Sequence, residues 1–249
     1  MAKSLIAGNW KMHGTAASAG AIAEELARNW NNQNSVEMIV FPPFVHLTSV
    51  AEAVGQTDIA VGGQNLCQFE SGAYTGEISA AMLADLGCQY VLVGHSERRA
   101  LFNESSETVA EKFKVAQQAG LIPVLCVGES LQQRQQKQTL EIVAQQISAV
   151  TKSVALQDLC RAVIAYEPVW AIGTGETASP EQAQEVHRAI RTQLGDAGRE
   201  TTLLYGGSVN PSNAAELFAQ PDINGGLVGG ASLKADDFLN IAQQLIEQE

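Results

Sequence analysis

The sequence predicts an α/β protein that folds as a single (β/α)8 barrel, a closed parallel sheet of eight strands surrounded by helices. Short apolar runs rich in β-branched residues alternate with helical segments along the whole chain. Eight such runs recur about every 30 residues, which is the length of one strand-helix-strand unit. This alternation is typical of a parallel sheet covered by helices, and eight units favour closure into a barrel.

Each predicted strand is a short apolar run. The runs are Leu5–Ala7, Met38–Phe41, Ile59–Val61, Tyr90–Val93, Ile122–Val127, Ala162–Tyr166, Leu203–Tyr205 and Gly226–Val228. The competing architecture is an open doubly wound sheet, which in its nucleotide-binding form carries a G-x-G-x-x-G turn after an early strand. The first run here is followed instead by Gly8-Asn-Trp-Lys11, which favours the barrel.

The predicted helices carry composition, spacing or capping signals. Residues Ala16–Asn29 are rich in alanine, and apolar residues recur at helical spacing within Glu107–Ala119 and Thr139–Val150. Ser179 followed by Pro180 is typical of a helix N-cap with proline in the first turn. No proline- or serine-rich linker interrupts the pattern, so residues 1–249 are expected to form one catalytic domain.

Composition excludes several classes of function. The chain has 15 Lys and Arg against 27 Asp and Glu, a net charge of −12, which opposes binding to nucleic acid or to an anionic membrane. The apolar run before Gly8 is only three residues long, which is too short for a secretory signal, and no run reaches the 18 or so residues of a membrane span. The cytoplasm is therefore the expected location. An anionic ligand would need a local binding site that overcomes the unfavourable overall charge.

The cysteines and histidines do not suggest a metal site. Cys67, Cys88, Cys126 and Cys160 are far apart and form no C-x-x-C pair, which predicts reduced and mostly buried thiols. The four histidines show no H-x-x-H spacing. We therefore expect no metal in the site.

Polar residues follow the predicted strands at the rim where such barrels place their active sites. Glu167 directly follows a strand and precedes a proline, which suits a partly desolvated general base. His95 precedes a predicted helical turn that begins at Ser96. The N-terminus of that turn disfavours the charged ring and leaves a neutral hydrogen-bond donor. Lys11 is the one lysine that immediately follows a strand, and Asn9 precedes it. Taken singly, each residue has a purely structural alternative, which is a solvated carboxylate for Glu167, a histidine satisfied by backbone groups for His95 and a structural amide for Asn9.

Glycine-rich turns follow the last two strands. Gly206-Gly207-Ser208 and Gly229-Gly230 stand where barrels bind phosphate through backbone N–H groups, and Gly173 could complete the site. The stretch from Pro168 to Gly175 places apolar side chains in a loop expected to be exposed, which suits a lid that excludes water; a loop packed permanently on the barrel is the alternative.

Five motifs, in order along the chain, resemble those of the triosephosphate isomerase family. They are Gly8-Asn-Trp-Lys11, Gly94-His-Ser-Glu-Arg98, Ala165-Tyr-Glu-Pro-Val-Trp-Ala-Ile-Gly-Thr-Gly175, Tyr205-Gly-Gly-Ser-Val-Asn210 and Leu227-Val-Gly-Gly-Ala231. The resemblance implies reversible, cofactor-independent interconversion of dihydroxyacetone phosphate and D-glyceraldehyde 3-phosphate through an enediolate, in glycolysis and gluconeogenesis.

The resemblance also implies residue roles. Glu167, His95 and Lys11 would be catalytic, and Glu97 would organise Lys11 and His95. The substrate-binding set would be Asn9, Lys11, Gly173, Ser208, Gly229 and Gly230. The lid would comprise Pro168, Val169, Trp170, Ala171, Ile172, Gly173 and Thr174. A homodimer is implied, in which Thr75 on the long segment Gln64–Glu77 reaches the partner's site.

Two positions depart from the family pattern: His13 stands where asparagine is common, and Glu176 where a basic residue is common. Another phosphate-binding barrel, such as a Schiff-base aldolase, would need Lys11 as its nucleophile. A barrel that only binds ligands or partners is the non-enzymatic alternative. Lys11, His95, Glu167 and the whole lid motif together favour the isomerase.

Overall fold

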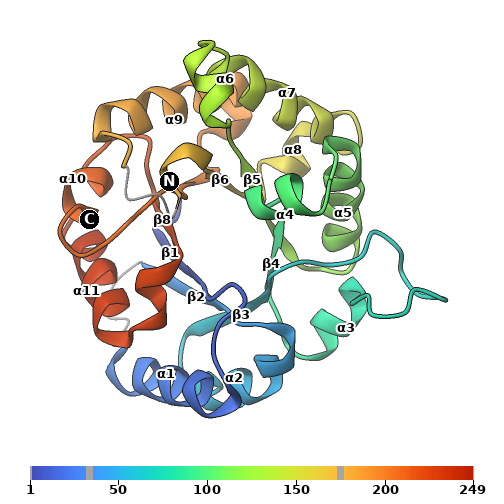
Figure 1. Cartoon of the computed structure of the whole chain (residues 1–249), viewed down its shortest axis with the longest axis vertical. Coiled ribbons are helices and arrows are strands. Elements are labelled where there is room, and N and C mark those ends of the chain that lie inside the picture. The colour runs from blue at the N-terminus through green and yellow to red at the C-terminus, as the bar shows by residue number, and fades with distance from the viewer. Residues whose placement is uncertain (1, 32–35, 173–176, 249) are drawn as a thin grey trace.

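A computed structural model describes residues 2–31, 36–172 and 177–248 of the chain. Eight parallel strands form a closed barrel in which each strand pairs with the next and β8 pairs with β1 (Figure 1). The strands are β1 Leu5–Asn9, β2 Glu37–Phe41, β3 Ile59–Gly63, β4 Tyr90–Val93, β5 Ile122–Val127, β6 Val163–Tyr166, β7 Thr202–Tyr205 and β8 Gly225–Val228. The predicted fold class is confirmed, and every predicted strand lies on an observed one.

Helices surround the barrel as a ring (Figure 1). They are α1 Ala16–Asn29, α2 Leu47–Val54, α3 Ala80–Asp85, α4 Ser96–Leu101, α5 Ser106–Gln118, α6 Leu131–Gln135, α7 Thr139–Thr151, α8 Leu156–Leu159, α9 Pro180–Leu194, α10 Ala214–Phe218 and α11 Ala235–Ile246. Short 3-10 turns occur at η1 Phe44–His46, η2 Val169–Ala171, η3 Gly195–Gly198 and η4 Gly230–Leu233.

Side-chain caps define the predicted helix starts. Thr15 and Ser18 form a reciprocal capping box at the start of α1. The observed helix begins and ends at the predicted residues, Ala16 and Asn29. Ser179 caps α9 in the same way, with Pro180 in the first turn, as predicted. These bonds satisfy backbone N–H groups that no helical carbonyl reaches.

The core has two layers because strand side chains alternate between the two faces of the sheet. Side chains such as Ala7, Phe41 and Leu92 fill the inside of the barrel. A second layer, between the strands and the helices, includes Ile6, Val40 and Phe113. Both layers are closed to solvent, so the strands form a rigid frame for the residues at their ends.

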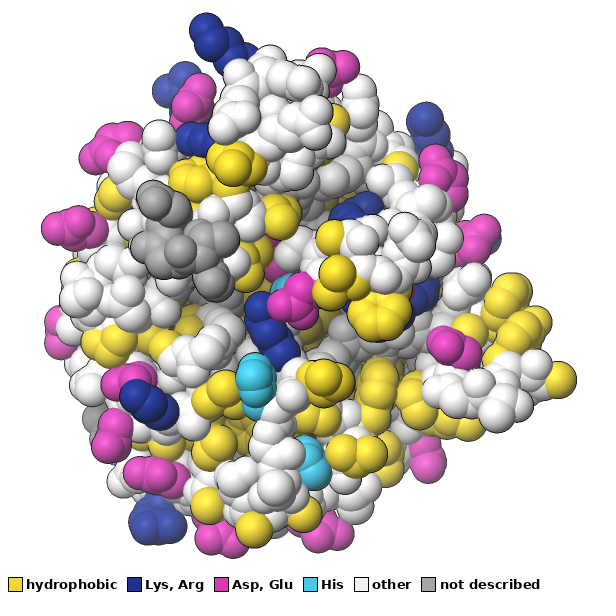
Figure 2. All heavy atoms as spheres, in the orientation of Figure 1, with side chains coloured by type: hydrophobic (Ala, Val, Ile, Leu, Met, Phe, Trp, Pro, Cys, Tyr) yellow, Lys and Arg dark blue, Asp and Glu magenta, His cyan; other side chains and the backbone are white. Residues whose placement is uncertain are grey.

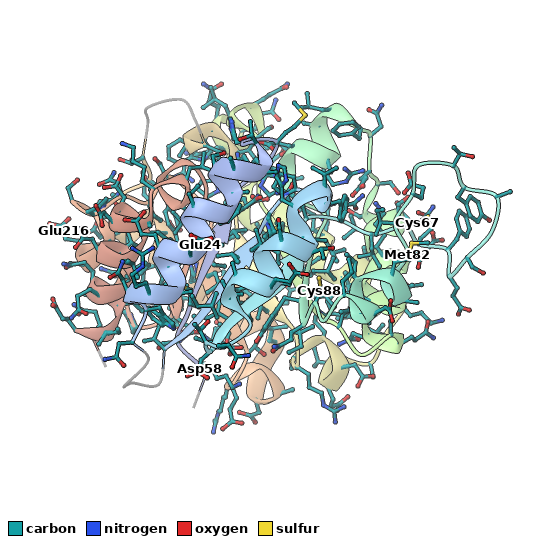
Figure 3. The ribbon with its side chains drawn as sticks, turned by 90° about the horizontal axis from the view of Figure 1, so that it is seen from below. Glu24, Asp58, Cys67, Met82, Cys88 and Glu216 are labelled. Carbon is teal, nitrogen blue, oxygen red and sulfur yellow. The ribbon has the colours of Figure 1, made fainter. Side chains whose placement is uncertain are left out.

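One loop departs from this compact frame. Residues 64–79 connect β3 to α3 and project away from the barrel (Figures 1 and 3). A hydrogen bond from the Cys67 N–H to the Ile78 carbonyl closes the base of the loop, and the rings of Phe69 and Tyr74 stack 4.3 Å apart within it. This loop contains the segment in which a dimer contact was expected.

The structure also tests two further predictions, that the cysteines are free thiols and that no segment spans a membrane. Cys67, Cys88 and Cys126 are buried, Cys160 is half-buried and all four are unpaired, which confirms the expected free thiols. Within the described ranges, no helix has the length and apolar character needed to cross a membrane.

His187 is a fully buried histidine in the layer between α9 and the barrel. Its Nδ1 lies 2.7 Å from the Ala183 carbonyl, and its ring packs edge-on against Tyr166 and tilted against Tyr205. Burial lowers its pKa below the ordinary value because the charged ring would lose its hydration.

We expect His187 to make stability depend on pH. Below about pH 6.5 the unfolded chain gains a proton that the folded chain does not, so unfolding free energy should fall by up to about 1.4 kcal/mol per pH unit. The His187→Phe variant keeps a ring but cannot titrate, so its loss between pH 7.5 and 5.5 should be smaller. Urea unfolding at fixed protein concentration measures both, and equal losses in the two proteins would contradict the assignment.

Candidate active site

A cavity of about 390 Å³ lies at the carboxyl ends of the strands. The viewed face of the molecule is hollowed near its centre, where basic, acidic and histidine side chains gather (Figure 2). The cavity is lined by Asn9, Lys11, His13, His95, Glu167, Ile172, Gly206, Gly207, Ser208, Val209, Asn210, Leu227, Gly229, Gly230, Ala231 and Leu233. The predicted residues from five separate strand ends therefore meet in one place.

Glu167 follows β6 directly, and its side chain is only 2% exposed. Its Oε2 accepts a hydrogen bond of 2.8 Å from the Ser96 N–H, and its Oε1 lies 3.0 Å from His95 Nε2. The two glycines around it make this placement possible. A Cβ at Gly206 would stand 2.9 Å from Glu167 Cγ, and one at Gly128 would stand 1.8 Å from the Glu167 carbonyl oxygen.

His95 stands at the junction of β4 and α4, where Gly94 has a φ of 73°. Its Nδ1 accepts a hydrogen bond of 3.2 Å from the Glu97 N–H, so the ring keeps a lone pair on that nitrogen. Its proton is then on Nε2, which faces Glu167 and the cavity. The first turn of α4 thus fixes the neutral tautomer that donates towards a ligand.

The two side chains shift each other's pKa. Burial raises the pKa of Glu167, but His95, the Ser96 N–H and Lys11 outweigh it and hold the pKa below the ordinary value. Burial lowers the pKa of His95, but the Glu167 carboxylate outweighs it and raises the pKa while the two are in contact. This direction differs from the lowered pKa expected from the sequence. The bond from Glu97 N–H nevertheless requires an unprotonated Nδ1, so we assign the neutral ring.

Lys11 adopts a left-handed backbone conformation, with a φ of 51°, which is strained for a residue with a side chain. Two contacts hold it there: its N–H donates to Asn9 Oδ1 at 3.0 Å, and its carbonyl accepts from Gln64 Nε2 at 2.8 Å. Its ammonium donates to Glu97 Oε1 at 2.6 Å. In this conformation the Lys11 side chain lines the cavity. It is the one Lys or Arg side chain among the described lining residues.

The glycine turns lie beside this cation. Ser208, Gly229 and Gly230 line the cavity as expected, and Lys11 Cε lies 3.5 Å from where a Cβ of Gly229 would stand. Gly230 also opens η4, at whose start backbone N–H groups have no partner within the turn. An anion bound here would contact both the Lys11 ammonium and the backbone N–H groups at the start of η4. Gly173 and Thr174 lie outside the described residues.

The loop after Glu167 packs on the barrel more closely than expected. Trp170 is half-buried and Ala171 is fully buried, so the prediction of an exposed apolar loop is wrong for the described part, Pro168–Ile172. Trp170 Nε1 donates to Glu129 Oε1 at 2.9 Å, and the Arg134 guanidinium lies 4.4 Å from the Trp170 ring centre. These contacts anchor the first part of the loop.

Sequence reasoning missed residues that support the site from outside it. Gln64 holds Lys11, Gly128 admits Glu167, and Ser96 binds the carboxylate through its backbone. A glycine or glutamine after a strand carries no distinctive signal, so only the fold reveals these roles. Thr75 is exposed on the projecting loop and does not line the cavity of its own chain.

A protein-family model described as triosephosphate isomerase matches residues 4–245. The chain belongs to the triosephosphate isomerase family. Among curated relatives, the triosephosphate isomerase of Thiobacillus denitrificans is 52% identical over 247 residues, covering 98% of each chain. That of Nitrosococcus oceani is 51% identical over 98% of this chain and 99% of its own, and that of Pseudomonas entomophila is 52% identical over 96% of each.

Membership of the triosephosphate isomerase family agrees with the resemblance seen in the five motifs. The match runs through every strand of the barrel, so it covers the site as well as the fold. Among the described residues, no group of three or more His, Cys, Asp or Glu side chains is arranged to hold a metal ion.

Proposed function

We propose that this chain is a triose-phosphate isomerase that interconverts dihydroxyacetone phosphate and D-glyceraldehyde 3-phosphate through an enediolate. The observation that carries the proposal is the contact of Glu167 Oε1 with His95 Nε2 at 3.0 Å, in a cavity that also holds Lys11 and the glycine turns. A carboxylate base and a neutral ring donor are the two groups that a proton shift beside a carbonyl requires.

In the proposed reaction, Glu167 takes a proton from one carbon of the substrate and returns it to the neighbouring carbon. His95 donates from Nε2 to the carbonyl oxygen and moves a proton between the two oxygens. Lys11 stabilises the negative charge that develops, and Asn9 and Glu97 hold Lys11 in place. Each proton that leaves the substrate returns to it, so the cycle needs no cofactor.

The phosphate group would lie against Ser208, Gly229 and Gly230, with Gly173 proposed from the sequence to complete the site. Residues Pro168–Thr174 are proposed to close over the bound substrate and exclude water, because an enediolate phosphate exposed to water loses its phosphate. The Trp170 contact with Glu129 supports the loop in the conformation described here. We also propose residues 1–249 as one catalytic domain acting in the cytoplasm.

A coupled spectrophotometric assay with D-glyceraldehyde 3-phosphate tests the proposal. Rapid turnover by purified protein is expected. The same protein incubated with substrate and borohydride tests the aldolase alternative, which predicts covalent trapping on Lys11. Absence of turnover in folded protein would leave a barrel that only binds anions.

We propose that the active form is a homodimer. Large apolar side chains are exposed on the projecting loop and in or just after the adjoining α3, namely Phe69, Tyr74, Met82 and Leu86, and also at Met12, Val45, Leu101 and Phe102. An exposed apolar surface of this kind supports a protein interface. The stacked Phe69 and Tyr74 rings preorganise the loop, so that Thr75 can reach the partner's Lys11 and His95.

We expect light scattering to give twice the chain mass of 26.4 kDa. Thr75→Arg places a charge at the proposed contact and should yield monomers with kcat reduced at least about tenfold, since a mispositioned catalytic group costs one to two orders of magnitude. Ala21→Arg, on the exposed side of α1, is the matched control and should change neither. A monomeric wild-type protein with full activity would refute the dimer.

A further inference from the structure

The turn after β7 leaves three consecutive backbone N–H groups free beside the substrate cavity. Gly207, Ser208 and Val209 line this cavity together with Lys11. Within the described ranges, their three N–H groups donate to no backbone carbonyl. Consecutive N–H groups without a partner form a concave donor surface that suits an anion. The turn therefore supports the proposed phosphate site only while its backbone keeps this conformation.

The sequence after Val209 is typical of a tight turn. Pro211 suits the second position of a β-turn, and asparagine suits the first because its side chain can accept a hydrogen bond from the backbone two residues later. Both features are present: the Asn213 N–H donates to the Asn210 carbonyl at 3.2 Å, and Asn210 Oδ1 accepts from the Ser212 N–H at 2.9 Å. The turn leads into α10, which lies in the ring of helices between α9 and α11 (Figure 1).

The Asn213 side chain reaches back from the end of this turn. Its Nδ2 donates to the Ser208 carbonyl at 3.0 Å, and its Oδ1 accepts from the Asn210 N–H at 2.8 Å. Asn213 is half-buried and is not among the described residues that line the cavity. One amide therefore joins both ends of the segment 208–210 without facing the ligand.

The bond to Ser208 fixes the direction of one peptide group. The Ser208 carbonyl points to Asn213, and the Val209 N–H belongs to the same peptide unit. This peptide bond is trans, so its N–H points the opposite way from its carbonyl, towards the cavity that Val209 lines. If the peptide turned over, the negative end of the carbonyl would face the cavity and oppose an anion.

We propose that Asn213 is a positioning residue for the phosphate group of the substrate, because its amide holds the peptide between Ser208 and Val209 with the N–H towards the cavity. This inference rests on the proposed function and deepens it. It assigns part of the preference for a phosphorylated substrate to a residue that does not touch the phosphate. Backbone donors are needed here, since Lys11 is the one Lys or Arg among the described lining residues.

Two substitutions of Asn213 and one matched control test the proposal. Asn213→Ala removes both side-chain hydrogen bonds. Asn213→Ser is too short to keep both bonds but retains a residue type that favours the start of a helix, so it separates the turn from α10. Gln184→Ala is the control. Gln184, on α9, is also a half-buried amide that donates one hydrogen bond and accepts one, both with Asp222, at 2.6 and 3.1 Å.

Two measurements isolate the contribution of the phosphate group. The first is the ratio of kcat/KM for D-glyceraldehyde 3-phosphate to kcat/KM for D-glyceraldehyde, which has no phosphate. The second is the Kd of sulfate, a dianion of similar shape, by titration calorimetry. In both Asn213 variants we expect the ratio to fall and the sulfate Kd to rise at least about fivefold, as expected for the loss of one or two hydrogen bonds. Gln184→Ala should match the wild type.

A kcat/KM ratio and a sulfate Kd that stay at the wild-type values in folded Asn213→Ala and Asn213→Ser would overturn the proposal. Equal changes in Gln184→Ala would also overturn it, because they would reflect a general loss of stability. A wild-type protein that converts neither substrate would refute the proposed function. The sulfate Kd needs no turnover, so it would still decide the role of Asn213.

Discussion

Replacing Glu167 by glutamine is expected to lower kcat by about 10²- to 10⁴-fold, the usual contribution of a general base. The amide keeps the size of the side chain and its place beside Ser96 and His95, but it cannot accept the substrate proton. Glu167→Asp keeps the carboxylate and withdraws it by one methylene from the His95 contact of 3.0 Å, so an intermediate loss is expected. The coupled assay measures both variants.

The Glu167→Gln variant also tests the contact between Glu167 and His95 independently of activity. The Glu167 carboxylate raises the pKa of His95, and without it burial and Lys11 lower that pKa. We therefore expect the pKa of His95 in Glu167→Gln to fall below its value in the wild type, measured by NMR of labelled histidine. A variant that loses kcat without any change at His95 would show that the two side chains do not meet in solution.

The regular alternation of apolar runs and helical segments along the sequence was enough to predict the barrel. Each strand is a short apolar run buried on both faces. The predicted ends of β4 agree with the structure because Gln89 and Gly94 bound the run, and β5 ends as predicted where Gly128 follows it. The prediction stopped short at β1, where Asn9 continues the strand although it is polar. Asn9 remains in the strand because it pairs with Phe41 in β2, a long-range contact that no local pattern shows.

The short helices were harder to predict. The four-residue α8 and the five-residue α10 have too few turns to show a helical period, and packing against the barrel stabilises them. The loop after Glu167 was misjudged for a related reason. Its place in a loop after a strand predicted that its apolar side chains would be exposed, but the Trp170 contact with Glu129, 41 residues earlier, packs the loop onto the barrel.

Sequence reasoning found the groups that face the cavity and missed those that support them. Lys11, His95 and Glu167 stand out because charged or titratable residues after apolar strands are unusual. Lys112 did not stand out, because a lysine within a predicted helix is normally solvated. In the structure it is buried, and its ammonium forms an ion pair with Glu104.

This ion pair belongs to a buried network close to the site. The Glu104 carboxylate accepts from Lys112 and from Arg98 of α4, and the Lys112 ammonium also donates to Asn65 at 2.8 Å. The network ties the projecting loop and α5 to the helix that positions His95. Burial raises the pKa of Glu104, but its two cationic partners outweigh it and hold the pKa below the ordinary value.

Lys112→Met is expected to cost about 3–5 kcal/mol of unfolding free energy, because it leaves the Glu104 carboxylate buried with one partner fewer. The double variant Lys112→Met with Glu104→Leu removes both charges and should recover most of that loss, since a buried ion pair contributes little net stability over apolar residues. Urea unfolding of the wild type, both single variants and the double variant completes the cycle. Additive losses in the double variant would contradict the coupling.

The same network predicts how stability responds to acid. The pKa of Glu104 is lower in the folded chain than in the unfolded chain, so its contribution is complete above the ordinary carboxylate pKa and is lost as pH falls through the lower folded value. Unfolding free energy of the wild type should therefore decrease below about pH 4.5. In the double variant this part of the acid dependence should be absent, which separates Glu104 from His187, whose effect begins near pH 6.5.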